Sequence, residues 1–475
     1  MYRPLRTLVS TAVLSILGTS AALATGFSLY TEGNGSATGN FGAGVAAEAT
    51  DASIGWFNPA GLVLIHDQQV VFGGVGVFPS SKLSGTSTFV AALPPPFGEI
   101  PFSESFNGIK STESAVVPSF HYALPLGENA TFGLSLVAPF GLSTDWGNAS
   151  PVRYEATLTK LTTVTLSPEL GGRLSDNFSI GAGLDLQFAK VTFNSIIGAP
   201  PFGEILEQGA NFLDSLSYNK GTSYGVGFHA GVMGMFNDNH TRIGLNYQSA
   251  IKHKFNGSSR LTGPLASTGN LFAPDGLPSS TFTSDALSSN PMNLPEIVTL
   301  SAYQDLNETF ALLGSVVYTG WHVFNNIKLN NVAAPFIDVD TGDVSNSYLD
   351  FSSPQNFKNT WRFALGGNYH VNNQWMLRVG GGFDQTPTND TDRDVRLPDS
   401  NRWALSAGAH YQMRPNIGID LGYTHLFGAN TTIDRTDALG ATSTYNVNAA
   451  VKSYADLVGA QLVWSFDKQP EIATK

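Results

Sequence analysis

Alternation of apolar with polar or small side chains is the feature that most limits how this chain can fold. It recurs along the chain in runs of roughly 10 to 16 residues, separated by polar connections. In the stretch "NIGIDLGYTHLF", Ile417, Ile419 and Leu421 fall on one face of a strand, and the residues between them are small or polar. A chain patterned in this way forms strands with one apolar face.

Counting these runs predicts about 14 strands, an even number. We expect them near residues 66–78, 111–125, 130–140, 152–174, 178–193, 222–236, 241–256, 294–304, 309–330, 358–370, 374–385, 400–412, 416–427 and 450–466.

The connections between these strands alternate in length. Six are tight turns, with the sequences "GENA", "SDN", "NDNH", "DLNE", "VNNQ" and "MRPN". Five are long, and cover residues 79–110, 194–221, 257–293, 331–357 and 428–449. Short turns on one rim and long loops on the other are typical of outer-membrane barrels. The predicted fold class is therefore all-β: a transmembrane antiparallel β-barrel of about 14 strands.

Composition supports a barrel over a secreted soluble β-sandwich, which would also alternate. Charged residues make up 13% of the 475 residues, aromatic residues 11%, and there are 50 glycines and no cysteine. Soluble domains carry about 25% charged residues, so the outer surface meets something other than water. In the last run, Leu462, Trp464 and Phe466 share one face, as in an aromatic girdle. A net charge of −12 argues against nucleic acid as a partner.

The N-terminus has the features of an export signal. Arg3 and Arg6 precede an apolar run, and Ala22-Leu23-Ala24 has the small-x-small form of a cleavage site, so we expect residues 1–24 to be removed. No later segment offers the roughly 18 apolar residues of a membrane-spanning helix. The expected location is the outer membrane of a Gram-negative bacterium.

Residues 25–65 precede the predicted barrel, which covers 66–466 and leaves a tail at 467–475. This segment is rich in glycine and alanine, and it ends in "WFNPAGLVLI". Pro59 lacks a backbone N–H and restricts Asn58, so we expect "WFNPAG" to lie outside any strand or helix. The segment is too apolar for a solvated linker, and a barrel of this size has a lumen it could fill. We predict an N-terminal lumen plug.

The residues resemble the FadL/TodX family of outer-membrane transporters for hydrophobic compounds, over nearly the whole mature chain. The matching stretches, in order, are "WFNPAGL", "PFGLSTDW", "IGLNYQSAIKHKFNG", "LPEIVTLSAYQDLNETFALLGSVVYTGW", "FKNTWRFALGG" and "LPDSNRWALSAGAHY". The resemblance implies a 14-stranded barrel with a hatch that carries the motif Asn58, Pro59 and Ala60. It implies passive uptake of long-chain fatty acids, with aromatic hydrocarbons as the alternative ligand. It also implies an outer apolar groove, a lumen pocket and sideways exit through a kink in the third strand.

Pro139 gives independent support for such a kink. It lies in the third predicted strand, followed by Phe140 and Gly141. A proline removes a ladder hydrogen bond, so in a barrel without edges it marks a local break. The alternative is that Pro139 ends the strand at the outer rim.

A fatty acid needs apolar walls and a cation for its carboxylate. By the resemblance, the candidates are Lys190 in the fifth strand and Lys358 and Arg362 in "FKNTWRFALGG". Lys190 shares a face with Leu186 and Phe188, which would meet lipid, so it reaches the lumen only through a bulge. The alternative for each is a solvated charge at the rim.

The long loops suggest a landing surface. The hexapeptide "PPFGEI" occurs at 95–100 and 200–205, and residues 205–218 have apolar side chains at roughly helical spacing, which predicts an amphipathic helix. Alternatively, these loops pack on each other.

We expect no enzyme, metal site or cofactor. "GTSYG" at 221–225 lies in a strand and not at a nucleophile elbow. "DVDTGD" and "NDTDRDVRLPD" could hold calcium, but are better explained as solvated loop charges. The expected partners are a hydrophobic small molecule and outer-membrane lipid, and the expected state is a monomer. The rival functions are a general porin, a barrel protease or lipase, and an adhesin.

Overall fold

The computed structural model describes residues 26–93, 98–111, 113–273, 275–338, 340–439 and 443–466. The predicted signal at 1–24 and the tail at 467–475 lie outside the described residues.

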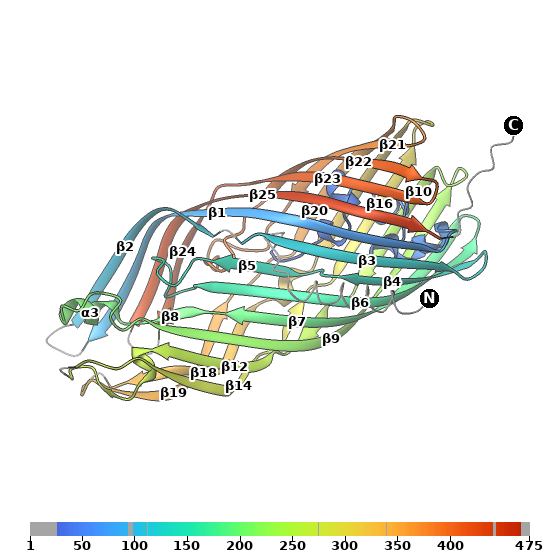
Figure 1. The fold of residues 1–475 in the computed structure, drawn as a ribbon. Coiled ribbons are helices and arrows are strands. Elements are labelled where there is room, and N and C mark those ends of the chain that lie inside the picture. The colour runs from blue at the N-terminus through green and yellow to red at the C-terminus, as the bar shows by residue number, and fades with distance from the viewer. Residues whose placement is uncertain are drawn as a thin grey trace.

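The strands are antiparallel and close into one barrel (Figure 1). The first group is β1 (Gln69–Leu93), β2 (Gly98–Ser111), β3 (Ala115–Pro125), β4 (Ala130–Val137), β5 (Gly141–Asp145), β6 (Leu158–Ser175), β7 (Phe178–Phe193), β8 (Ser195–Ile197), β9 (Ser215–Phe236), β10 (Thr241–Gln248), β11 (Ile251–His253) and β12 (Asn256–Gly263). The second group is β13 (Gly269–Asn270), β14 (Ser280–Ser289), β15 (Met292–Leu294), β16 (Ile297–Asp305), β17 (Phe310–Thr319), β18 (Asn326–Ile337), β19 (Asp343–Pro354), β20 (Thr360–His370), β21 (Trp375–Asp384), β22 (Arg402–Arg414), β23 (Ile417–Gly428), β24 (Thr431–Leu439) and β25 (Ser443–Ser465).

These pieces make up 14 barrel strands, as the alternation predicts. Bends and bulges divide several of them, so that β2 continues into β3 and β4 into β5. The first and last strands close the ring, with Gln69 opposite Ser465. Among the described residues, no helix is long and apolar enough to span a membrane.

Most of the long connections are strands rather than loops. Within the range predicted as a loop, residues 79–93 form the upper part of β1 and residues 98–110 form nearly all of β2, and Ser84 pairs with both Asn107 and Ala450. The stretches 257–293, 331–357 and 428–449 likewise contain β12 with β14, β18 with β19, and β24 with β25. Above the membrane the outer face of a strand is polar, so the apolar alternation that reveals a strand disappears. The prediction of loops there was wrong.

The outer wall is apolar, whereas many of the inward side chains are polar. On β7, Phe178, Ile180 and Leu184 are exposed, whereas Ser179 and Asp185 are buried. Exposed apolar side chains that form a band around a closed barrel are the surface that lipid covers. Trp464 and Phe466 are on this outward face, as expected for a girdle.

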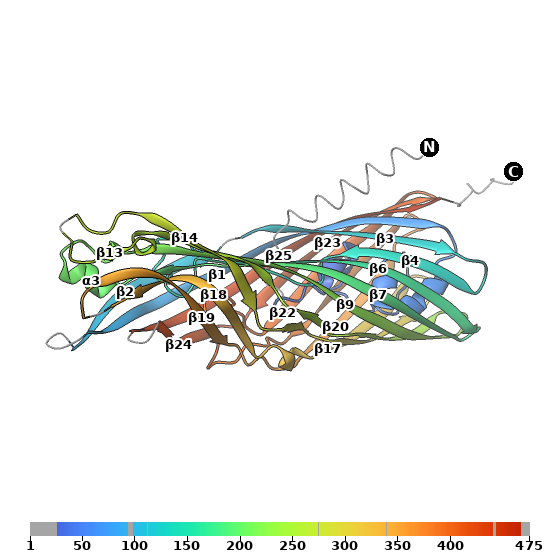
Figure 2. The same ribbon diagram turned by 90° about the horizontal axis from the view of Figure 1, so that it is seen from below.

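The N-terminal segment lies inside the ring of strands, where its short helical turns are visible in both views (Figures 1 and 2). These turns are η1 (Thr31–Gly33), η2 (Ser36–Gly39), α2 (Ile54–Phe57) and η3 (Pro59–Leu64). Trp56 and Phe57 complete the single turn of α2, and Pro59 opens the 3-10 helix η3, so the expectation that "WFNPAG" avoids helix was wrong. Asn58 separates the two with extended backbone and caps η3 by accepting the N–H of Ala60 at 3.2 Å.

The remaining helices lie in connections: α3 (Pro200–Ile205), η4 (Pro264–Ala266) and η5 (Trp321–Val323). The predicted helix at 205–218 is absent, because Gly209 takes a positive φ of 89° and β9 begins at Ser215. Helix α3 packs against β1 and β2, so these outer segments do contact each other.

Candidate ligand-binding pathway

An apolar cavity of about 770 Å³, including its open mouth, lies in the upper part of the barrel. Its lining is Phe27, Leu142, Thr159, Lys160, Leu161, Val191, Phe193, His253, Phe255, Met292, Leu294, Phe324, Ile327, Leu329, Gln355, Phe357, Asp394, Arg396 and Leu397. Mostly apolar walls with a few polar groups are typical of sites for hydrophobic ligands.

Arg396 is the buried cation of this cavity. Its Nη1 donates to Thr159 Oγ1 at 2.9 Å and to the Asn194 carbonyl oxygen at 3.2 Å, and its Nη2 donates to the carbonyl oxygen of Glu155. The guanidinium carbon lies 3.4 Å from the ring centroid of Phe193. Burial lowers the pKa of Arg396 to about 10, so the group remains charged at neutral pH. The hydrogen-bond acceptors are all neutral, and the nearest compensating charge is the carboxylate of Asp394, which lines the same cavity.

Glu155 lies on the loop beside Arg396 and its Oε1 accepts the N–H of Val395 at 3.1 Å. Burial, and then the charges of Asp394 and Asp437, raise the pKa of Glu155 to about 8. The side chain therefore holds a proton at neutral pH and adds little negative charge that would oppose a carboxylate ligand.

The third barrel strand is interrupted at Pro139. β4 ends at Val137, β5 begins at Gly141, and Thr163 bridges the break, because its Oγ1 accepts the N–H of Phe140 at 3.0 Å and donates to the Phe140 carbonyl oxygen at 2.7 Å. The strand resumes beyond Pro139, so it does not end there.

The wall is incomplete beside this break. The β3–β4 ladder reaches only to Phe120 opposite Leu136, and within the described ranges β5 has ladder partners on β6 alone. Two side-chain hydrogen bonds join β5 to the residues around the start of β3 instead. Ser143 Oγ donates to Glu113 Oε2, and the N–H of Asp145 donates to Ser111 Oγ, both at 3.1 Å. The edges of β3 and β5 therefore face each other without a ladder.

The start of the N-terminal segment occupies the inner side of the break. The N–H of Leu29 donates to the Pro139 carbonyl oxygen, and the N–H of Gly141 donates to the Phe27 carbonyl oxygen, both at 2.8 Å. The ring of Phe27 lies 4.6 Å from that of Trp321 and 5.2 Å from that of Phe324, which lines the cavity. Phe27 thus separates the cavity from the strand break.

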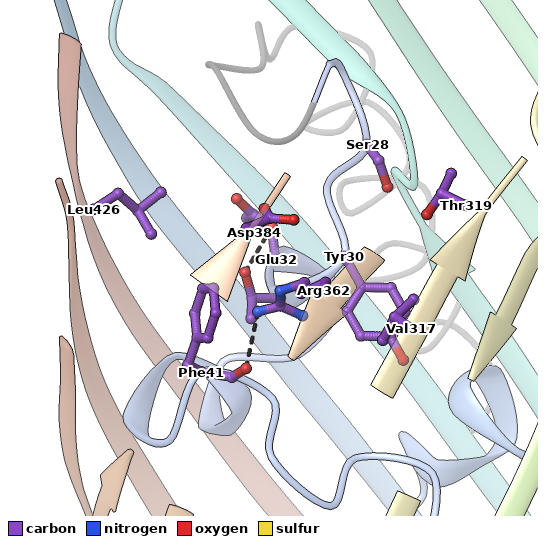
Figure 3. A pocket seen from close by; sticks show the side chains of 10 residues that line it. Ser28, Tyr30, Glu32, Phe41, Val317, Thr319, Arg362, Asp384 and Leu426 are labelled. Atoms are coloured by element: carbon purple, nitrogen blue, oxygen red, sulfur yellow. Dashed lines mark hydrogen bonds between the residues drawn. The ribbon is translucent and has the colours of Figure 1, made fainter. Parts of the chain in front are cut away.

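A second cavity, about 430 Å³, lies beside the N-terminal segment (Figure 3). Arg362 of β20 lines it, donates from Nη2 to the Phe41 carbonyl oxygen at 2.8 Å, and stacks 3.8 Å from the Phe41 ring centroid. Its Nη1 has no hydrogen-bond acceptor among the described residues. Glu32 lines the same cavity, and burial raises the pKa of that carboxyl above its usual range. Arg362 is thus a lumen cation with an unused donor.

The structure does not bring Lys190 and Lys358 to Arg362. Lys190 is exposed on the outer wall, because β7 has no bulge there and Lys190 keeps the outward direction of Leu186. Lys358 is also exposed, and only its backbone N–H is engaged, with the Pro387 carbonyl oxygen at 2.8 Å. The expectation that Lys190 reaches the lumen was wrong, and the exposed Lys358 fits the alternative of a solvated charge.

Asn58 makes hydrogen bonds both within the N-terminal segment and to the barrel wall. Its side-chain amide donates to the Ala46 carbonyl oxygen at 2.9 Å and to the Val232 carbonyl oxygen of β9 at 3.2 Å. Gly231 and Gly244 leave room for this approach, since a Cβ on either would overlap Asn58 or Ala46. Gly171 and Gly181 likewise leave room for the backbone of Pro59, which a Cβ on either glycine would overlap.

Two buried wall histidines also hold the segment. His121 Nε2 lies 3.0 Å from the Gly33 carbonyl oxygen, and His229 Nε2 lies 3.1 Å from that of Gly55. The Nδ1 of His229 lies 2.9 Å from Asp185 Oδ1. Because a carbonyl and a carboxylate both accept, His229 contacts both only with a proton on each ring nitrogen or with Asp185 protonated.

A third cavity, about 900 Å³, opens at the rim of short turns, on the other side of the N-terminal segment. Its walls include Asp51, Arg378, His410 and Asp420, with His410 Nδ1 3.0 Å from Asp420 Oδ1. Such polar walls do not suit a hydrophobic ligand.

Arg396 was not among the predicted site residues, because "NDTDRDVRLPD" was interpreted as solvated loop charges. In fact Arg393, Asp394, Arg396 and Asp399 are each at most 5% exposed, so that interpretation was wrong. Alternating Arg and Asp in a chain otherwise poor in charge could have indicated internal pairing. No group of metal-ligating side chains occurs in the part of the chain that the structure describes. The contacts of His121 and His229 with the N-terminal segment could not be predicted, because the histidines are scattered along the sequence and form no motif.

The family model described as "Outer membrane protein transport protein (OMPP1/FadL/TodX)" matches residues 15–466. The chain belongs to this family. FadL/TodX proteins are outer-membrane transport channels and not enzymes, and this chain is accordingly a multi-pass outer-membrane barrel.

Relatives and solved structures agree with the assignment. The long-chain fatty acid transport protein of Escherichia coli K12 is 27% identical over 444 residues, which are 89% of this chain and 92% of the relative. The crystal structure of a Pseudomonas aeruginosa FadL homologue superposes with a TM-score of 0.75 at 24% identity, covering 93% of this chain and 100% of that one. The Pseudomonas putida toluene transporter TodX gives 0.60 at 15% identity, over 88% and 95%. The last two show the fold alone.

Proposed function

We propose that the protein is a passive outer-membrane channel for long-chain fatty acids. The observation that carries this proposal is the apolar cavity with Arg396 buried in its wall, hydrogen-bonded only to neutral acceptors. A fatty acid fits both features, because its chain needs apolar walls and its carboxylate needs a cation. An aromatic hydrocarbon would contact the walls but would make no use of the positive charge of Arg396.

The proposed path begins at the open mouth, where the carboxylate meets Arg396, and continues inward past Phe27. Residues on both sides of Phe27 form one buried apolar cluster, which joins Leu161 and Phe324 of the cavity to Phe140 at the break. Arg362 offers its free Nη1 to a carboxylate further along, beside the same segment.

We propose that the ligand leaves sideways, through the gap between β3 and β5, into the membrane. The gap is supported by the missing ladder beside Pro139, Phe140 and Gly141. Direct passage to the short-turn rim would take an apolar chain through the polar cavity at Asp51 and Asp420. The whole path lies within one chain, so the proposed working unit is a monomer without a cofactor.

Residues 26–65 are the proposed hatch. Asn58, Pro59 and Ala60 hold it against β7 and β9, and its first residues cover the break. Movement of Phe27–Leu29 away from Pro139 would open the cavity toward the gap.

Uptake of labelled oleate and labelled toluene by cells with and without the gene tests the ligand. The proposal requires the gene to raise oleate uptake. A gene effect on toluene alone would establish the aromatic alternative, and no effect on either would exclude transport of both. Increased leakage of small polar solutes would instead support a general porin.

A further inference from the structure

Three lysines lie side by side on the outer face of the barrel. In the ladders, Lys82 of β1 is opposite Lys110 of β2 on one side and opposite Lys452 of β25 on the other. The neighbours Ser81 and Leu83 are fully buried in the interior, so Lys82 points outward. Like charges opposite one another on adjacent strands repel and cost stability.

A second group of three lies on another part of the same wall. Lys160 of β6 and Lys220 of β9 are both opposite Thr192 of β7, and Lys190 is the next outward residue on β7 toward the short turns. Lys160 borders the apolar cavity, but it alternates with the buried Thr159 and Leu161, so its side chain is directed outward. Lys190 is therefore a diagonal neighbour of the other two, within about 7 to 8 Å between backbones. We call these two groups the lysine triads.

Both triads lie at the outer boundary of the lipid-facing band. The last outward apolar side chains below them are Phe78 on β1 and Phe188 on β7. β1 begins at Gln69 and β7 at Phe178, so Lys82 and Lys190 come just beyond the roughly 9 to 11 residues that a tilted strand needs to cross the hydrocarbon. That height is where the headgroups of the outer leaflet lie.

The protein itself does not neutralise these lysines. Within the described ranges every ion pair is made by an arginine or a histidine. The chain has 37 acidic against 25 basic residues, so acidic partners were available to it. Clustered cations of this kind, without protein partners and at headgroup height, complement an anionic lipid.

We propose that the lysine triads bind the phosphate groups of the phosphorylated glycolipid that forms the outer leaflet. The triads flank the strand break: Lys110 is on β2 at one side, and Lys160, at the other side, is opposite Ser143 of β5. Bound glycolipid would border the gap between β3 and β5. The binding does not depend on which ligand the channel carries.

The test uses the full chain in detergent with added lipid A, against lipid A from which the phosphates have been removed. Native mass spectrometry counts retained lipid. The variant is Lys110→Gln with Lys452→Gln, and the control, Arg173→Gln with Arg414→Gln, removes the same charge at the short-turn rim. Each lysine near an anionic headgroup is worth about 1 kcal/mol, so in the lysine variant we expect roughly 30-fold weaker retention of lipid A at the mutated triad, unchanged retention at the other triad, and no change for the control.

A second measurement protects against a folding defect. Without lipid A, the lysine variant should unfold at the same or a higher temperature than the wild type, because repulsion in the row is removed. With lipid A, the order should reverse. Equal retention of both lipids by the wild type, equal loss in the two variants, or full displacement of lipid A by inorganic phosphate would overturn the proposal.

Discussion

The backbone N–H of Gly141 donates a hydrogen bond of 2.8 Å to the carbonyl oxygen of Phe27, so the beginning of the N-terminal segment pairs with the wall strand where that strand is broken. Leu29 adds a second bond to the Pro139 carbonyl oxygen. A short segment held by two backbone bonds separates easily compared with a full ladder. The same contact can therefore close the gap and release it.

Phe27→Ala should open the cavity toward the gap. The change keeps the backbone bond to Gly141 but removes the ring that contacts Trp321 and Phe324. We expect uptake of a hydrophobic dye to rise several-fold, because the apolar barrier is gone. The measurement is dye entry into proteoliposomes, with Phe466→Ala on the outer wall as the matched loss of an aromatic ring. Equal entry in Phe27→Ala and wild type would remove the barrier role.

Arg396→Gln should weaken fatty acid binding by about 10- to 100-fold, since a hydrogen bond to a charged group is worth roughly 1.5 to 3 kcal/mol. Binding of an alcohol with the same chain should change little, because it carries no charge. Titration of the purified barrel with oleate and with oleyl alcohol measures both. Arg396→Lys keeps the charge and should recover part of the oleate affinity, whereas Arg414→Gln should behave as wild type. Equal losses for acid and alcohol would mean that Arg396 only supports the loop.

The outer loops should lose stability as pH rises. The pKa of Glu155 is about 8 in the folded protein and 4.5 in the unfolded chain, so between these values the folded state binds one more proton. The contribution is fully present below pH 4.5, is lost as pH rises through 8, and is flat above that. Thermal unfolding of the wild type and of Glu155→Gln from pH 4 to pH 9 measures this, and the variant should show the smaller fall. A steeper fall in the variant would show that Glu155 is ionised in the folded protein.

Asn58→Ala should loosen the hatch and leave the barrel intact. The substitution leaves the Ala46 and Val232 carbonyl groups without their donor, at a cost of about 1 to 3 kcal/mol. Hydrogen exchange of residues 46–64 should become faster, while exchange in β20 to β23 stays as in the wild type.

Pro59→Gly should change ligand uptake without changing assembly of the barrel. Wild-type exchange and uptake in both variants would exclude a moving hatch anchored at this motif.

Much of the fold follows from side-chain alternation. Phe178, Ile180 and Leu184 alternate with buried Ser179 and Asp185, and lipid on one side with polar interior on the other produces that pattern directly. Alternation stops at the lipid boundary, which is why the strand hairpins beyond Lys82 and Lys452 were predicted as loops. Side-chain alternation correctly predicts that Lys190 lies on the outer face, whereas the family resemblance implied a position in the lumen.

The site was less predictable because its contacts join distant residues. Phe27 pairs with Gly141, and Arg396 reaches Thr159 and Phe193, across separations at which no local pattern signals contact. Burial of the charges around Arg396 depends on how the loop folds back into the mouth. By contrast Pro139 acts through its own backbone chemistry, and its break could be predicted from the residue alone.

The most direct test of the proposed path is photo-crosslinking of a diazirine-bearing fatty acid to the purified barrel, with unlabelled oleate as competitor, followed by peptide mapping. We expect competed crosslinks at the cavity, around Leu142, Phe193 and Phe324, and at the edges of the gap between β3 and β5. Crosslinks confined to the polar cavity at the short-turn rim, around Gln374 and Gln412, would contradict it.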